Sequence, residues 1–238
     1  MLVKLWKNNK GFIVGILLML FFRSAIADWY QVPSGSMQPN ILIGDRVWVN
    51  KLAYDIKIPF SEINLSRKAE PSVGDVIVFQ SAKADERLIK RVVGIPGDKI
   101  AMLNNRLTVN GKLVNFDELG VKQAFDEFMQ DRDSASYFTE HPPQLFVPVN
   151  QASDVSQNKG YSVRLNKQSY SRFSTFSEIE VPSDHYWVMG DNRDNSADSR
   201  VIGAVPREEL IGRAERVVIS LDKNNYYLPR GGRYWERL

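Results

Sequence analysis

The N-terminal part of the chain contains an uninterrupted run of uncharged, mostly apolar residues. Residues 11–22 read GFIVGILLMLFF, and residues 1–10 before them hold three lysines. Such a run after a basic segment predicts an N-terminal transmembrane helix, an anchor over residues 11–27. The run has twelve residues, fewer than the roughly 20 that cross a bilayer. A crossing therefore needs flanking residues and an Arg23 side chain that reaches outward.

The same segment also fits a cleaved secretory signal. Residues 25–27 have the A-x-A pattern of a cleavage site after a basic and an apolar region. In the alternative, the segment is retained, and Trp29 and Tyr30 lie at the depth of the lipid headgroups. Both interpretations place the lysines in the cytoplasm and the residues after Asp28 outside.

After residue 28 the apolar positions follow the period of β-strands. Asp45–Asn50 alternate between polar and apolar, and Asp75–Phe79 and Leu88–Val93 form compact apolar runs. The pattern resumes with His185–Gly190 and Arg216–Ser220 near the end of the chain. Gly, Pro or Asn residues bound the earlier runs, so the pattern predicts a mainly β protein.

Predicted turns and a change in amino-acid composition divide this β region. Asn104-Asn105 and Asn110-Gly111 predict hairpin turns on either side of a strand at 106–109. Phe116–Met129 is the best helix candidate after the anchor, and residues 150–177, rich in Ser, Asn, Gln and Tyr, indicate an insertion. The predicted units are a basic segment at 1–10, the anchor at 11–27, a first core part at 28–111, an inserted subdomain at 112–180 and a second core part at 181–238.

The charge distribution argues against a nucleic-acid partner. The formal net charge is +3, but residues 1–23 hold four of the 31 basic residues and none of the 28 acidic ones, so the remainder carries −1. A nucleic-acid-binding domain concentrates Lys and Arg on its folded part. The chain has no cysteine, which excludes thiol nucleophiles and Cys-ligated zinc, and it has only two histidines, His141 and His185.

Two short segments carry candidate chemistry. Residues 33–39, PSGSMQP, have the composition of an ordinary turn, but such a turn can also present the Ser36 hydroxyl. Lys90 lies in a predicted strand, on the same face as Leu88 and Val92. Its ammonium either reaches solvent, which is the common case, or is desolvated, with a pKa low enough for the neutral amine to act as a general base.

A third segment, Gly190–Arg200, reads GDNRDNSADSR. Its acidic and amide residues suggest a calcium loop. However, in an EF-hand register from Asn192 or Asp194, the glycine at loop position six and the glutamate at position twelve are missing. We therefore expect no metal here, and interpret the segment as a structured polar loop that orients another group.

These segments together resemble the type I signal (leader) peptidase family. The family's serine lies in a P-S-G-S-M-x-P segment directly after a membrane helix, and its lysine lies in an I-K-R-V-x-G-x-P-G-D strand, matched by Ile89–Asp98. The loop matches G-D-N-R-D-N-S-x-D-S-R at every fixed position, and Gly74–Phe79 also resembles the family's strand. The resemblance covers about residues 29–107 and 181–222. Asn40 departs from the more common Thr, for which we expect little effect.

The resemblance implies a fold and a role for particular residues. The fold would be mainly β, with a signal-peptidase-like antiparallel catalytic core, an inserted subdomain and one preceding transmembrane helix. Ser36 would be the nucleophile and Lys90 the general base. The remaining roles would be an oxyanion hole from the Ser34 hydroxyl and the Ser36 amide, orientation of Lys90 by Ser196, an ion pair of Asp198 with Arg200, and shallow substrate pockets lined by Val32, Pro33 and Ile89.

The resemblance also implies substrates and a location. The enzyme would remove signal peptides from secretory pre-proteins after small residues, without a cofactor, through an acyl-enzyme. Its partners would be those precursors and membrane lipid, at a bacterial inner membrane with the catalytic domain on the outer side. A peptidase with membrane-inserted substrates benefits from a tether, so the retained anchor is favoured over cleavage at Ala27.

Three rival functions are less well matched. A Ser-His-Asp hydrolase would need His185 or His141, and neither histidine lies in a recognisable motif. A dedicated conjugation-type maturation peptidase would share the serine and lysine, but usually has cysteines and a less complete third motif. An inactive anchored binding protein is disfavoured by the presence of Ser36, Lys90 and Ser196 together.

Overall fold

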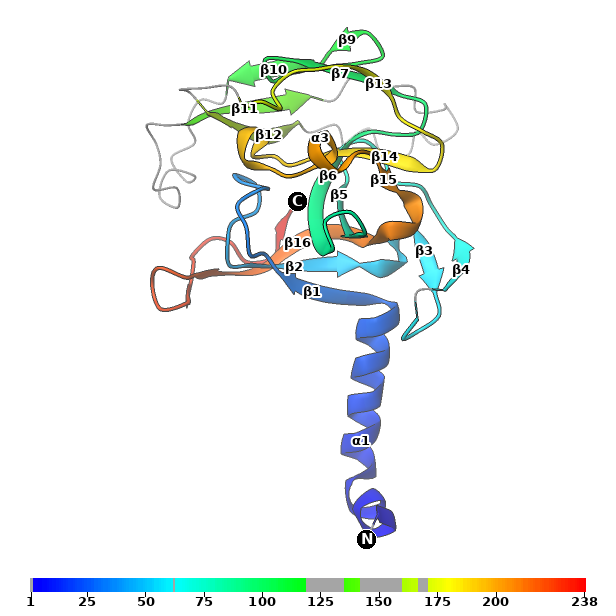
Figure 1. Ribbon diagram of the computed structural model, residues 1–238. Coiled ribbons are helices and arrows are strands. Elements are labelled where there is room, and N and C mark those ends of the chain that lie inside the picture. Colours follow the sequence, from blue (N-terminus) through cyan, green and yellow to red (C-terminus); the bar gives the residue numbers. More distant parts are fainter. Residues whose placement is uncertain (1, 62, 119–134, 142–159, 167–170) are drawn as a thin grey trace.

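A computed structural model shows a body of antiparallel β-sheets from which one N-terminal helix projects (Figure 1). The structure describes all residues except 1, 62, 119–134, 142–159 and 167–170. The elements are α1 (Leu2–Ala25), β1 (Ala27–Gln31), β2 (Asp45–Asn50), η1 (Lys51–Ala53), β3 (Asp55–Lys57), β4 (Asn64–Arg67), β5 (Val76–Ser81), β6 (Glu86–Gly94), β7 (Lys99–Leu103), β8 (Arg106–Val109), β9 (Lys112–Leu113), β10 (Asn115–Glu118), β11 (Ala135–His141), β12 (Tyr161–Asn166), β13 (Phe176–Glu180), β14 (His185–Met189), η4 (Arg193–Asn195), α3 (Ser199–Ile202), β15 (Val205–Pro206), η5 (Arg207–Glu209), β16 (Leu210–Asp222), β17 (Leu228–Pro229) and β18 (Glu236–Arg237).

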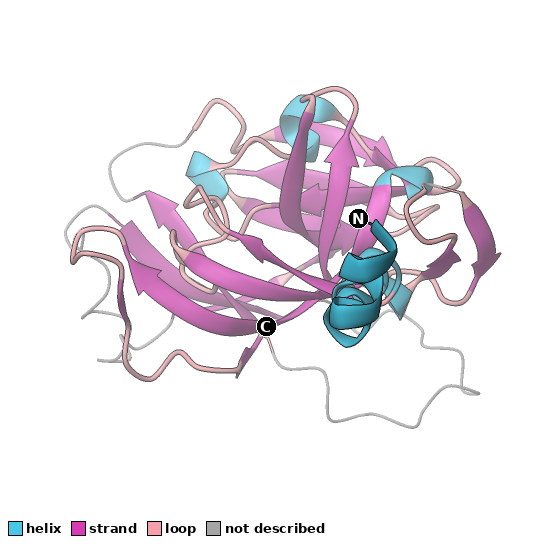
Figure 2. Cartoon of the chain, turned by 90° about the horizontal axis from the view of Figure 1, so that it is seen from below, coloured by secondary structure: helices cyan, strands magenta, loops and turns pink. Residues whose placement is uncertain are grey.

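The largest sheet confirms the predicted mainly β fold. Its strands follow the order β1-β2-β16-β5-β6-β14-β15, and every pairing within it is antiparallel. Strand β16 pairs with β2 and with β5, and its register shifts in both ladders. Register shifts of this kind bend a strand and increase its twist. The view from below shows how these long strands curve around the body (Figure 2).

The two predicted hairpin turns are present. Strands β7, β8 and β9 are joined by Asn104-Asn105 and Asn110-Gly111, and all four residues have positive φ, between 49° and 75°. Positive φ at both central positions lets a two-residue turn follow the twist of its strands. Strand β13 pairs with β7 on the other side. This sheet therefore contains strands from both sides of residue 112, and the predicted domain boundaries stay a prediction.

The predicted helix at Phe116–Met129 is wrong where the structure describes it. Residues Asn115–Glu118 form β10, which pairs with β11 from Asn115 opposite His141 to Glu118 opposite Phe138. Pairing with a distant strand overrides the weak helical periodicity of this segment. Residues 119–129 of the prediction lie outside the described residues.

Helix α1 begins nine residues before the predicted anchor, and it does not have the hydropathy of a membrane-crossing helix. By length and hydropathy, no helix in the described part of the chain qualifies to cross a membrane. The cations at Lys4, Lys7, Lys10 and Arg23 limit the longest uncharged run of the helix to the twelve residues 11–22. The exposed fractions of Phe12, Leu17 and Leu18 are 71%, 56% and 63%.

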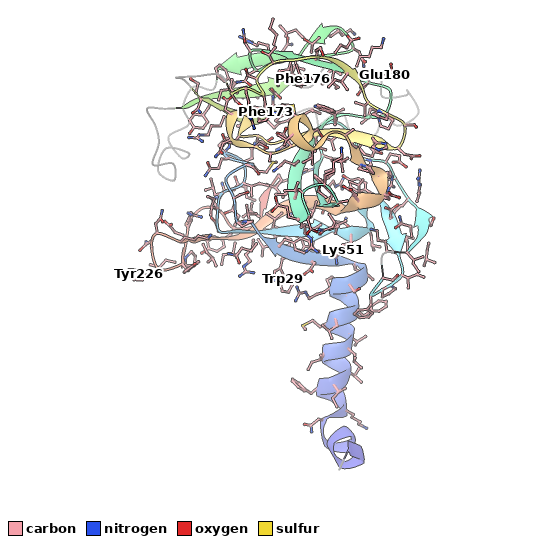
Figure 3. All side chains as sticks on the ribbon, in the orientation of Figure 1. Trp29, Lys51, Phe173, Phe176, Glu180 and Tyr226 are labelled. Carbon is pink, nitrogen blue, oxygen red and sulfur yellow. The ribbon has the colours of Figure 1, made fainter. Side chains whose placement is uncertain are left out.

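The end of α1 is fastened to the β-sheet. The Lys51 ammonium donates to the carbonyl oxygens of Arg23 at 2.7 Å and of Ser24 at 3.3 Å. A cation at these orphan carbonyls complements the negative end of the helix dipole. Arg23 also forms a 2.8 Å ion pair with Asp28 at the start of β1. Figure 3 shows Lys51 and Trp29 at this junction.

An apolar cluster packs beneath the segment that holds Ser36. Met37 and Ile41, both fully buried, anchor the segment in this cluster, and the other members come from β2, β5, β16 and the segment itself. The buried members are Val32, Met37, Ile41, Val47, Val49, Val76, Val78 and Ala214. Val32 before Ser36 and Met37 directly after it are both buried, and burial on either side of Ser36 restricts where its backbone can lie.

Candidate active site

Lys90 is buried on a central strand of the large sheet. It lies in β6, opposite Ile77 of β5, at the point where the exposed first half of β6 becomes fully buried. Only 2% of Lys90 is exposed. Lys is almost never buried without a partner, so this burial distinguishes Lys90 from an ordinary strand residue whose ammonium reaches solvent.

The partner of Lys90 is Ser36. The Lys90 Nζ donates a 2.7 Å hydrogen bond to the Ser36 Oγ, although the two residues are 54 positions apart. Ser36 is itself 7% exposed, so the pair is largely shielded from water but reachable from one side. A nucleophile and a base within hydrogen-bond distance is the geometry that activates a hydroxyl.

Burial lowers the pKa of Lys90, as a general base requires. Desolvation, the largest cause, lowers the pKa of Lys90 from 10.5 to about 8. The charge of Arg200 also lowers this pKa, and the charges of Asp198, Glu86 and Asp191 oppose the shift. An amine with this pKa is partly neutral near physiological pH and can accept a proton from a hydroxyl.

The polar loop at 190–200 holds the Ser36 turn from the other side. The Asn192 backbone N–H donates to the Ser36 carbonyl at 3.0 Å, and the Asn192 side chain donates to the Gly35 carbonyl at 3.0 Å. Asp191 anchors the loop to β6 through a doubly hydrogen-bonded ion pair with Arg91, at 2.8 Å for each bond. The loop therefore connects the turn that holds Ser36 with the strand that holds Lys90.

The predicted pair of Asp198 and Arg200 closes this loop. The Arg200 guanidinium donates to both Asp198 carboxylate oxygens at 2.8 Å, and the Gly190 N–H donates to the same carboxylate at 2.9 Å. Burial alone would raise the pKa of Asp198, but the bonds and charge of Arg200 outweigh it, so the pKa lies below its usual value. Asp198 therefore stays ionised and holds both ends of the loop.

Ser196 lies close to the Ser36 turn, and no hydrogen bond joins it to Lys90 among the bonds described. Its Oγ is buried and makes no hydrogen bond of good geometry among the described residues, but it lies close enough to the Asp198 carboxylate to help lower the pKa of Asp198. A Cβ built on Gly190 would lie 2.3 Å from this Oγ and 2.5 Å from the Ser36 carbonyl oxygen, so the two serines flank the same glycine. The orienting role expected for Ser196 stays a prediction.

We expect Gly190→Ala to lower kcat strongly. The added methyl would overlap the Ser36 carbonyl and the Ser196 side chain at distances that no Cβ tolerates, so at least one of them must move. Displacement of a reacting group by about 1 Å can cost on the order of a hundredfold. Steady-state kinetics on a short peptide measures this, with Gly231→Ala as a control at a position with open space around its Cβ and no positive φ. If the Gly190→Ala enzyme were as active as the control, a methyl group at position 190 would not displace Ser36.

The other predicted site residues lie along the same segment. Ser34 and Pro33 are exposed just before Ser36, and Val32 is buried in the apolar cluster beneath them. Ile89 is partly buried and packs against that cluster from β6. Val32, Pro33 and Ile89 thus adjoin the dyad, and their role as pocket walls stays a prediction.

The histidine alternative has no support from geometry. His185 begins β14, and its Nδ1 lies 2.8 Å from the Ser183 carbonyl oxygen. The Ser36 hydroxyl, which a catalytic histidine would have to contact, is bonded to Lys90 instead. The side chain of His141 lies outside the described residues.

Sequence reasoning missed Asn40, for which little effect was expected. Its side-chain amide donates to the Asp191 carboxylate at 2.7 Å and to the Ser162 carbonyl at 2.6 Å. Asn40 therefore links the Ser36 segment to the polar loop and to β12. Both partners are more than 120 positions away along the chain, so no local signal could have shown them.

Sequence comparisons with known proteins give matches over most of the chain. The sequence profile of the family described as "Signal peptidase, peptidase S26" matches residues 5–219. Three bacterial relatives, each called signal peptidase I, are similar in sequence. They come from Buchnera aphidicola subsp. Acyrthosiphon pisum (32% identical, 94% of this chain and 78% of the relative), Pseudomonas aeruginosa (32%, 89% and 72%) and Aquifex aeolicus (34%, 84% and 78%).

Proposed function

The chain belongs to the signal peptidase family, peptidase S26, and from this membership we propose that it cleaves with a dyad of Ser36 and Lys90. As a type I signal peptidase it is a hydrolase that removes signal peptides from pre-proteins. The single observation that carries the proposed dyad is the 2.7 Å contact between the Lys90 Nζ and the Ser36 Oγ.

The proposed reaction begins with proton transfer within this contact. Neutral Lys90 accepts the Ser36 hydroxyl proton while the Oγ attacks the carbonyl carbon of the scissile peptide bond. The tetrahedral intermediate collapses when Lys90 returns the proton to the leaving nitrogen, so the C–N bond breaks and an ester to Ser36 remains. Lys90 then takes a proton from water as the water oxygen attacks the ester carbon. As the bond from this carbon to the Ser36 Oγ breaks, Lys90 returns the proton to the Oγ, which releases the acid product and restores Ser36 and neutral Lys90.

The oxyanion of the intermediate requires donors close to Ser36. We assign the Ser36 backbone N–H and the Ser34 hydroxyl to this role, because Ser34 is exposed two residues before the nucleophile. A donor aimed at the developing oxyanion typically contributes about 2.7–4 kcal/mol. Removal of the Ser34 hydroxyl would therefore weaken catalysis without removing either member of the dyad.

The pH dependence of cleavage tests the base. Since Lys90 must be neutral and its pKa is about 8, kcat/KM should rise with pH through about 8 and fall by tenfold per pH unit below it. The profile is measured on a short peptide between about pH 5 and pH 11, with circular dichroism showing the range in which the enzyme stays folded. An acidic limb near the ordinary lysine value of 10.5 would contradict the buried base.

The cleavage position tests the proposed substrate preference. The segment of Val32 and Pro33 and the neighbouring Ile89 are proposed to form shallow apolar pockets for the first and third residues before the cut. Such pockets exclude bulk, so a precursor with Ala at both positions should be cut there and a matched precursor with Phe at the first position should not. Mass spectrometry of the products gives the position of the cut.

We also propose that α1 attaches the catalytic domain to a membrane. Its apolar side chains from Phe12 to Phe22 are largely exposed, and it projects from the sheets (Figure 1). Burial of such exposed apolar area in lipid is favourable at roughly 25 cal/mol per Å². Flotation of the full chain with lipid vesicles tests the attachment. The position of the catalytic domain on the outer side of a bacterial inner membrane stays a prediction.

A further inference from the structure

A buried ion pair beside the dyad has no part in the reaction described so far. Glu140 accepts two hydrogen bonds from the Arg193 guanidinium, and the side chains of both residues are almost completely buried, with 0% and 1% exposed. Two charges removed from water in this way are costly unless every bond is made. A pair of this kind therefore fixes the position of the segments that it joins.

The two partners come from different parts of the fold. Arg193 lies in the polar loop that holds the Ser36 turn, whereas Glu140 lies in β11, within the part of the chain predicted as an insertion. Strand β12 completes the arrangement. Its Tyr161 hydroxyl donates to Glu140 at 2.9 Å, and its Tyr161 ring lies 4.2 Å from the guanidinium of Arg91, the residue next to Lys90.

Arg193 connects Glu140 to the surroundings of Ser36 and Lys90 through hydrogen bonds. Its Nε donates to the Gly190 carbonyl at 3.2 Å, and its own carbonyl accepts from Arg200 at 2.6 Å. Gly190 is the residue that Ser36 and Ser196 flank at close range. A shift of the Arg193 guanidinium would therefore move Gly190, and with it the surroundings of the nucleophile.

We propose that Glu140 is a positioning residue for catalysis: from β11, it holds Arg193 so that the polar loop keeps Ser36 and Lys90 aligned. Tyr161 supports Glu140 in this role. In this proposal, contacts from strands β11 and β12 stabilise the positions of Ser36 and Lys90. This inference rests on the proposed Ser36–Lys90 mechanism, and it assigns a part in that mechanism to the region whose role the sequence did not show.

Glu140→Gln tests the role, since it preserves volume but leaves the Arg193 charge without its counter-charge. Because the loop would shift while the substrate-binding segment stays in place, kcat on a short soluble peptide should fall about ten- to a hundredfold with KM changed by less than about threefold. The melting temperature should also fall. A Glu140→Gln enzyme with the kcat of the wild type overturns the proposal.

A double variant separates positioning from stability. Glu140→Gln combined with Arg193→Met removes both charges, which usually restores much of the stability. It also removes the bond from Arg193 to Gly190, so kcat should stay low while the melting temperature recovers. If kcat recovers together with the melting temperature, the pair is only structural. The double variant also decides the matter if Glu140→Gln alone does not fold.

A distant buried pair provides the matched control. Asp55 of β3 and Arg207 of η5 form an ion pair at 2.8 Å with 3% of each side chain exposed, and Arg207 also pairs with the more exposed Glu70. Asp55→Asn should lower the melting temperature but leave kcat per folded molecule unchanged, and an equal loss of kcat in this variant would contradict the specific role of Glu140. The wild type and Ser36→Ala are measured alongside: an active Ser36→Ala enzyme would overturn the dyad itself, whereas an unaffected Glu140→Gln enzyme overturns only this inference.

Discussion

Ser36→Ala should lower kcat/KM for a signal-peptide substrate by roughly ten-thousandfold or more. The change removes the oxygen that is proposed to form the acyl-enzyme, and loss of a serine nucleophile in other enzymes costs factors of this size. Because Lys90 loses its 2.7 Å partner, a destabilisation of about 1 kcal/mol is also expected, which leaves the protein folded. Cleavage of a purified pre-protein, followed by gel shift and mass spectrometry, measures the loss.

A second serine provides the control. Ser66 lies exposed on β4, and its hydroxyl bonds only to the adjacent Arg67 carbonyl among the bonds described. Ser66→Ala should therefore cleave like the wild type. A Ser36→Ala protein that also cleaved at that rate would show that another residue is the nucleophile, and the interpretation of the Lys90 contact would have to be abandoned with it.

The sequence predicted those parts of the molecule that depend on local pattern. The turns at Asn104-Asn105 and Asn110-Gly111 follow from residues that tolerate positive φ, and the structure confirms both. The strands β2, β5 and β6 follow from alternation or from compact apolar runs. Ser36 and Lys90 were singled out by motif, but only the folded chain brings them to 2.7 Å.

The parts that sequence reasoning missed depend on contacts between distant segments. Residues Phe116–Glu118 are a strand because β11 pairs with them, and that pairing has no signature within the segment itself. The bonds of Asn40 likewise reach partners 122 and 151 positions away, and those of Glu140 reach Tyr161 and Arg193, 21 and 53 positions away. A polar residue that will be buried in such a network looks, along the chain, like any surface residue.

The charge and the proton of Lys90 can be separated by two substitutions. Lys90→Arg keeps the positive charge, but its guanidinium cannot lose a proton at accessible pH and so cannot act as a base. Lys90→Met removes the charge and keeps the approximate length. If Lys90 is the base, both enzymes should be inactive, with losses of roughly ten-thousandfold. If Lys90 served only as a positive charge, Arg would be tolerated and Met would not.

The same two variants should also differ in stability. If the Lys90 ammonium stabilised the fold through a salt bridge, its removal in Lys90→Met would destabilise the protein, but we expect the reverse. Burial lowers the pKa of Lys90 from 10.5 to about 8, so the folded state disfavours the ammonium by up to about 3 kcal/mol. This cost is fully present below pH 8. It disappears as the pH rises from about 8 to 10.5, because the folded protein has then already lost the proton that the unfolded chain still holds.

Lys90→Met has no such cost, so it should unfold at higher denaturant than the wild type at pH 7, and the advantage should shrink toward pH 10.5. Lys90→Arg should be the least stable of the three, since it buries a larger cation that cannot neutralise itself. Urea unfolding at pH 7 and at about pH 10 measures all three proteins. A Lys90→Met protein less stable than the wild type at pH 7 would show that the ammonium stabilises the fold, and would remove the physical basis for Lys90 as a neutral base.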